Sequence, residues 1–129
     1  MTSFLSPLLQ PGQPPLALTN RRNNRIVAAT LITAFDSASR RKGLLDRASL
    51  ADGSAMIIAP TSAIHTFAMR FTIDVIFVSK EGRVLKVRPH VKPRRIAAAW
   101  RAFAVVELPA GTIEHSDTRA GDRLQIATV

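Results

Sequence analysis

The sequence lacks cysteine and tyrosine, and Trp100 is its single tryptophan. Without cysteine the chain has no disulfide, no thiolate nucleophile and no cysteine-based zinc site. Aromatic residues make up only 5% of the 129 residues, which leaves few side chains that could stack on nucleic-acid bases. These absences fit a protein of a reducing compartment, and we expect a cytoplasmic location with no metal and no cofactor.

Long apolar runs are also missing. No stretch approaches the roughly 18 apolar residues of a membrane span. The N-terminus has no basic segment, and its prolines interrupt every apolar run, so it does not resemble a signal peptide. We expect residues 1–24 to be a flexible leader and residues 25–129 to be a single compact domain, which is long enough to bury a core.

The charge of the chain is strongly unbalanced, with 18 Lys and Arg against 9 Asp and Glu. Residues 83–101 alone hold seven Lys or Arg and no acidic residue. Such a surface attracts polyanions in a salt-dependent way, although a solvated loop has the same composition. Trp100 is more typical of a core or lid residue than of a stacking platform. The residues expected to contact an anion or nucleic acid are Arg88, Lys92, Arg94 and Arg95.

Short β-rich segments separated by turn residues run through the compact part of the chain. We expect strands at 25–36, 54–60, 103–111 and 121–129, and a hairpin at 73–91 with Gly82 closing its loop. A short helix is expected between its cap Asp36 and Gly43, with basic residues 40–42 on its exposed face, and one helical turn at 112–120. Residues 92–102 are typical of a linker. About five to seven strands and one or two short helices predict a mainly β fold, either a small barrel or a strongly bent sheet.

The segment "HTFAMRFTID" places a histidine, an arginine and an aspartate within ten residues, among large apolar side chains. Strand alternation puts Asp74 in the same row as Ile76 and Val78, where an ionised carboxylate is costly unless it is paired or hydrogen-bonded. In one interpretation Asp74 is a structural lock, held by backbone N–H groups or by a nearby cation. In the other it orients a ligand or accepts a proton beside His65. The candidate cations are His65, Arg70 and Arg47.

Glu107, in "VVELP", also has two interpretations. It either points outward from a half-buried strand or pairs with Arg47 or another arginine. An Asp74 and Glu107 pair separated by roughly 5–10 Å could support acid–base hydrolysis. The common nucleophile, phosphate-binding and dinucleotide motifs do not occur, and the three histidines have no short metal-ligand spacing.

Three segments occur in a recognisable order: "RRKGLLDR" at 40–47, "HTFAMRFTIDVIFVSKEGRVLKV" at 65–87 and "VVELPAGTIEHSDTRAGDRL" at 105–124. As a set they resemble the bacterial and archaeal family called domain of unknown function 192, over roughly residues 26–129. The family has no assigned activity, so the resemblance implies a compact, mostly β domain more than a function. Many members have Trp-Met-Lys-Asn where this chain has residues 68–71. If the tryptophan and asparagine contact a ligand in those members, the difference implies that this chain has a different ligand or none. The positions that match the motif are Arg47, His65, Met69, Asp74, Glu107, Gly111 and Asp122.

These observations favour a non-enzymatic binding or interaction module. Its candidate site consists of His65, Arg70 and Asp74, with Arg47 and Glu107 nearby. An anionic small molecule, an acidic protein surface or nucleic acid would be the partner. Two alternatives remain open: a small hydrolase that uses Asp74 or Glu107 with His65, and a nucleic-acid-binding domain that uses residues 83–101.

Overall fold

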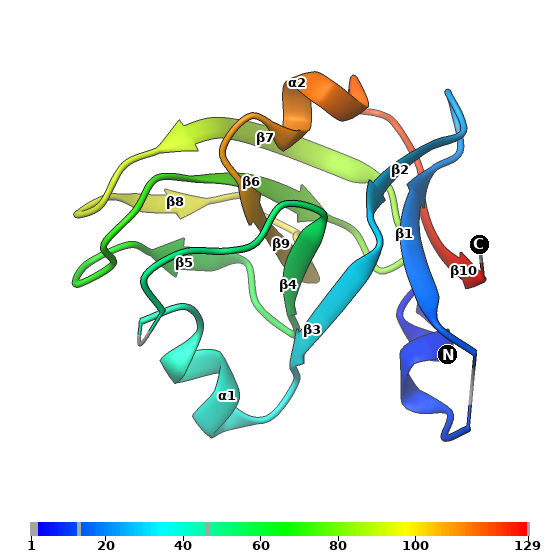
Figure 1. Ribbon diagram of the computed structural model, residues 1–129, viewed down its shortest axis with the longest axis horizontal. Helices are drawn as coiled ribbons and strands as arrows, with labels where there is room; N and C mark the ends of the chain where they lie inside the picture. The colour runs from blue at the N-terminus through cyan, green and yellow to red at the C-terminus, as the bar shows by residue number, and fades with distance from the viewer. Residues whose placement is uncertain (1–2, 13, 46, 129) are drawn as a thin grey trace.

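A computed structural model describes residues 3–12, 14–45 and 47–128. The fold is mostly β, and its described strands form three sheets (Figure 1). The five-stranded sheet contains, in spatial order, β3 (Thr30–Ala34), β4 (Ser54–Ile58), β9 (Ala104–Pro109), β6 (Ile73–Val78) and β7 (Val84–Val91). The three-stranded sheet contains β10 (Leu124–Thr128), β1 (Leu16–Asn20) and β2 (Arg25–Ala28), and the two-stranded sheet pairs β5 (Ala63–His65) with β8 (Ile96–Ala98). The helical segments are η1 (Ser6–Leu9), α1 (Ser37–Lys42) and α2 (Thr112–Ser116).

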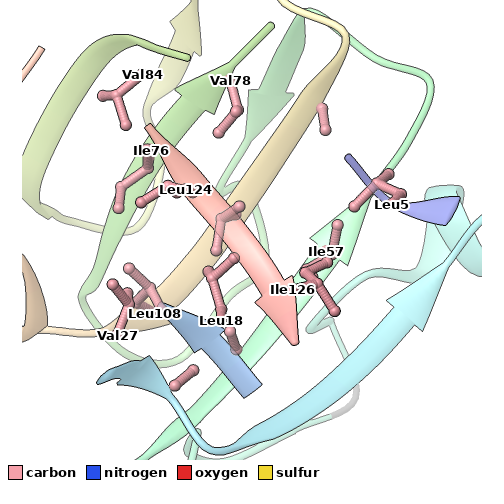
Figure 2. Close-up of a cluster of buried hydrophobic side chains, with 14 of the residues drawn as sticks. Leu5, Leu18, Val27, Ile57, Ile76, Val78, Val84, Leu108, Leu124 and Ile126 are labelled. Carbon is pink, nitrogen blue, oxygen red and sulfur yellow. The ribbon is translucent and has the colours of Figure 1, made fainter. Parts of the chain in front are cut away.

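The five-stranded sheet is buried on both faces, because every residue of β4, β6 and β9 is buried. One face packs against the three-stranded sheet through a cluster that includes Leu18, Ile76 and Leu124 (Figure 2). The opposite face carries Val75 and Phe77, which pack with residues of the β5–β8 sheet and of the segment after α1. Within the described ranges, no helix is long and apolar enough to cross a membrane.

Several predicted elements are confirmed, including the mainly β fold class. The strands β6 and β7 form the expected antiparallel hairpin, and Gly82 in its turn has a φ of 93°. Helix α1 begins where expected, because Asp36 Oδ1 accepts a hydrogen bond from the Ser39 backbone N–H at 2.8 Å. It ends at Gly43, whose φ is 48°. The barrel alternative does not hold, since the strands form open sheets, and ten strands are described where five to seven were expected.

The single strand expected at residues 25–36 is two strands in different sheets. Strand β2 pairs with β1, whereas β3 pairs in parallel with β4. The chain changes sheet at Ala29, where the backbone N–H groups of Ala29 and Thr30 both donate to the Gly53 carbonyl, at 2.8 and 3.1 Å. A continuous β-rich run in the sequence does not reveal this corner.

The compact fold includes residues that the sequence assigned to a flexible leader. Strand β1 lies between β10 and β2, and Leu5 is buried in the core. Prolines 14 and 15 precede β1 and do not interrupt it, so they delimit the strand rather than prevent it. The predicted linker at 92–102 is also wrong, because it contains β8, in which Ala97 pairs with Ile64.

Asp122 links the end of strand β1 to the segment that precedes β10 through hydrogen bonds. Its carboxylate accepts hydrogen bonds from Asn20 Nδ2 at 2.8 Å, Arg22 Nε at 2.7 Å and the Arg119 backbone N–H at 2.9 Å. Burial raises the pKa of Asp122, but the hydrogen bonds from Arg22 and Asn20 outweigh burial and hold this pKa below its ordinary value.

We predict that Gly82→Ala destabilises the fold more than Gly121→Ala does. Both glycines have positive φ, so alanine costs about 1–2 kcal/mol at either position. At Gly82 a Cβ would also lie 2.5 Å from the Leu124 carbonyl oxygen, whereas nothing lies within 4 Å at Gly121. Urea unfolding of both variants measures the difference, and equal losses of stability would contradict the close approach of the hairpin turn to β10.

Candidate functional site

A cavity of about 640 Å³ lies beside the face of the five-stranded sheet that carries Val75 and Phe77. Helix α1 and the residues after it form one wall, and β5 forms the other; both elements lie on the same side of the sheet (Figure 1). Side chains from β4, β9 and the β5–β6 loop complete the lining. The lining residues are Ser37, Arg40, Arg41, Gly43, Leu44, Leu45, Ile58, Thr61, Ala63, Ile64, His65, Met69 and Glu107.

Glu107 brings a buried carboxyl group to this cavity from the centre of the sheet. It lies opposite Met56 on β4 and Val75 on β6, so its side chain points to an apolar face. The residue is 3% exposed, and its Oε1 is buried without a hydrogen-bond partner in the described part of the chain. Burial raises the pKa of Glu107 from 4.5 to about 7. This group therefore exchanges its proton near neutral pH.

The cavity also receives positive charge from its walls. Arg40 and Arg41 come from the last turn of α1, and His65 comes from β5. Arg40 donates to the Phe35 carbonyl at 2.7 Å, whereas Arg41 and His65 are exposed. The cavity thus combines cationic groups, a buried ionisable carboxyl group and an apolar lining.

Asp74 lies on the other face of the sheet and is fully buried. Its Oδ1 accepts a hydrogen bond from the His90 backbone N–H at 2.9 Å. Its Oδ2 accepts from the backbone N–H groups of Gly111 at 3.1 Å and Ile113 at 2.9 Å, at the start of α2. Asp74 therefore joins β6 to β7 and to α2, as the lock interpretation describes. It does not form a pair with Glu107, because alternation sends the two side chains to opposite faces.

The structure brings together only two of the five central candidates, His65 and Glu107. Arg47 is exposed beside a separate cavity of about 300 Å³ and forms no ion pair with Glu107 within the described part of the chain. Arg70 is exposed in the β5–β6 loop.

Sequence reasoning missed Arg40 and Arg41 as site residues. The signal that could have found them was their position at the end of a capped helix. Lys92, Arg94 and Arg95 are exposed after β7, and Arg88 is half-buried on β7. Among the described residues, no three His, Asp or Glu side chains cluster to hold a metal.

We predict that Asp74→Asn destabilises the fold by about 2–4 kcal/mol. The asparagine amide nitrogen cannot accept a hydrogen bond, so at least one of the three backbone N–H groups loses its acceptor. Urea unfolding at neutral pH measures the loss, with exposed Asp52→Asn as the control. A change in Asp74→Asn no larger than in the control would contradict the structural role.

We predict that Glu107→Gln becomes more stable relative to the wild type as the pH rises. Between pH 4.5 and 7 the folded state keeps a proton that the unfolded state has lost. Wild-type stability therefore falls over this window by up to about 3 kcal/mol, relative to a protein without the group. Glutamine does not titrate, so the variant gains on the wild type. Unfolding from pH 4.5 to 8 tests this, with exposed Glu81→Gln as the control, and parallel curves for Glu107→Gln would refute it.

Comparison with known proteins identifies the family. A protein of unknown function from Novosphingobium aromaticivorans DSM 12444 has a similar structure, with a TM-score of 0.74, 23% identity and coverage of 90% of this chain and 89% of that one. A candidate transcription regulator from Sinorhizobium meliloti 1021 also has a TM-score of 0.74, with 21% identity and coverage of 85% and 90%. These likenesses show a common fold, and no curated protein matches the chain. The sequence model of DUF192, described as uncharacterized ACR, matches residues 18–126, and the chain therefore belongs to the DUF192 family.

Proposed function

We propose that this protein binds a small anionic molecule in the cavity between α1 and β5. The observation that carries the proposal is the buried Glu107 carboxyl group, whose Oε1 has no hydrogen-bond partner among the described residues. A buried polar atom without a partner costs stability, and a ligand that supplies the missing hydrogen bond recovers that cost. The cavity volume of about 640 Å³ suits a small molecule.

The charges around the cavity favour an anionic ligand. Arg40 and Arg41 can contact an oxyanion from the α1 wall, where the guanidinium group offers several N–H donors. Leu44, Ile58 and Met69 provide apolar contacts for the rest of the ligand. An anionic ligand also disfavours the ionised form of Glu107, because two negative charges would then share the cavity. Glu107 therefore acts in its protonated form, as a hydrogen-bond donor to an oxygen of the ligand.

A thermal-unfolding screen tests the proposal. The probes are inorganic phosphate, sugar phosphates, mononucleotides and dicarboxylates, because a ligand that binds only the folded state raises the midpoint by mass action. We expect at least one probe to stabilise the wild type and to lose most of its effect in Arg41→Gln and Glu107→Ala. Arg21→Gln, an exposed arginine on the β1–β2 turn, is the control. A probe that stabilises all four proteins equally binds elsewhere, and a screen without any shift would refute an anionic ligand of these classes.

We predict that the affinity of such a ligand falls above pH 7, by up to about tenfold per pH unit, because binding requires a protonated Glu107. Glu107→Gln keeps a donor and does not titrate, so it loses this pH dependence. His65 also lines the cavity, and His65→Gln separates its contribution. Isothermal titration calorimetry from pH 6 to 9 measures the slope. If the affinity instead rises with pH, the ligand presents a positively charged group to the ionised Glu107 carboxylate, which would contradict this prediction.

A hydrolase is the second candidate function. It is supported by one observation, that a carboxyl group with a pKa raised to about 7 shares a cavity with a histidine. In this case Glu107 and His65 would exchange protons with the substrate and an attacking water. Turnover of p-nitrophenyl esters and phosphates that disappears in both Glu107→Gln and His65→Gln would favour hydrolysis. The absence of turnover in the wild type with bound ligand would favour the binding module.

A further inference from the structure

The β5–β8 sheet and its flanking residues expose large apolar side chains, of which Phe67, Ile96 and Trp100 do not line the proposed ligand cavity. Alternation along β8 buries Ala97 in the core and leaves Ile96 and Ala98 exposed. Across the pair, Ile96 lies opposite His65, whose ring contacts Phe67 at a centroid distance of 5.6 Å. Trp100 lies in the turn that follows β8 and is 85% exposed, while Ile96 is 67% and Phe67 46% exposed. Three of the five large apolar side chains that are exposed in the described chain thus belong to this sheet and its flanking residues.

Basic side chains flank this surface. Thr66 is fully buried and holds the β7–β8 loop beside Phe67, since its Oγ1 donates to the Lys92 carbonyl at 2.6 Å and accepts from the Arg95 N–H at 2.9 Å. At the other end of β8, the Arg101 guanidinium lies 4.8 Å from the centre of the Trp100 ring. No Asp or Glu occurs in segments 60–73 and 91–103, which contain β5, β8 and the residues that flank them. Its exposed basic residues are Arg70, Lys92, Arg94, Arg95 and Arg101.

We propose that the outer face of the β5–β8 sheet binds the surface of an anionic lipid bilayer. Apolar and aromatic side chains enter the boundary between headgroups and acyl chains, and tryptophan favours this region. Lys and Arg around them attract the negative headgroups. The two requirements, an apolar centre and basic surroundings, are met by the same short sheet.

The same features argue against the other occupants of such a surface. Two copies of the chain would bring five like charges from each protein together, which opposes self-association through this face. Single-stranded nucleic acid requires several aromatic platforms for its bases. The side chains of Ile96 and Ala98 provide neither a stacking surface nor a hydrogen bond to a base. Acyl chains accept these side chains without any polar contact.

Vesicle binding of the full chain tests this inference. The vesicles contain phosphatidylcholine alone or with about 30% phosphatidylserine, and the binding is measured by co-sedimentation at low salt. We expect at least about tenfold tighter binding to the anionic vesicles. Because Trp100 is the only tryptophan, its fluorescence reports insertion directly, and we expect its emission to shift to the blue.

Matched variants separate the apolar and the basic contributions. Ile96→Ser should weaken binding by about tenfold, whereas Leu9→Ser, which alters an equally exposed side chain on η1, should not. Replacement of both Arg94 and Arg95 by glutamine should weaken it by about twenty-five-fold, since each basic residue contributes on the order of fivefold. The same replacement at Arg21 and Arg123, which are exposed elsewhere, is the control.

Three outcomes would overturn the inference. The first is no binding to anionic vesicles at low salt. The second is binding without a blue shift and without an effect of Ile96→Ser, which would be non-specific attraction to a basic protein. The third is tighter binding to a single-stranded oligonucleotide that depends on Trp100 and competes with the vesicles, which would assign this face to nucleic acid.

Discussion

The burial of the five-stranded sheet on both faces is the constraint that governs this protein. Strands β6 and β9 in its interior carry one carboxyl group each, and both groups are buried. A buried carboxyl group must find hydrogen bonds inside the protein or take up a proton. Asp74 and Glu107 represent these two outcomes, one on each face of the same sheet. The Asp74 carboxylate is held by backbone hydrogen bonds, whereas the Glu107 carboxyl group borders the cavity in which we propose that a ligand binds.

Asp74 shows how a charge can be accommodated without a cation. Three backbone N–H groups converge on its carboxylate from β7 and from the start of α2. These donors would otherwise need other acceptors, so the carboxylate and the backbone satisfy one another. Glu107 has no such arrangement, and its side chain borders a cavity instead. A group that lowers stability and adjoins a cavity is typical of a site kept for function rather than for folding.

The local elements were predictable because their signals are short-range. The cap at Asp36, the glycine at 43 and the glycine in the β6–β7 turn each act within a few residues of their own position. The lock around Asp74 was predictable in kind, since a buried carboxylate in a strand requires donors. Its partners were not, because Gly111 and Ile113 are 37 and 39 residues away in sequence. Glu107 was predicted either to point outward from a half-buried strand or to pair with an arginine. In the described structure its side chain is buried and its Oε1 has no partner, because its burial depends on how α1 and β5 cover the sheet.

The β5–β8 sheet was missed for a different physical reason. Its strands have three residues each, and residues 97–99 are alanines, which carry no β-branched signal. Trp100 was expected in a core or lid because large apolar side chains are usually buried. Here Ala97 and Ala99 pack against the core, whereas Trp100, in the turn that follows β8, is exposed. In a chain with one tryptophan and no tyrosine, the most exposed large apolar side chain of the described residues therefore lies in a segment, residues 91–103, that has arginines and no acidic residue. The exposed tryptophan and the basic residues around it do not contribute to the core, and a partner that matches them has a surface that is both apolar and negatively charged.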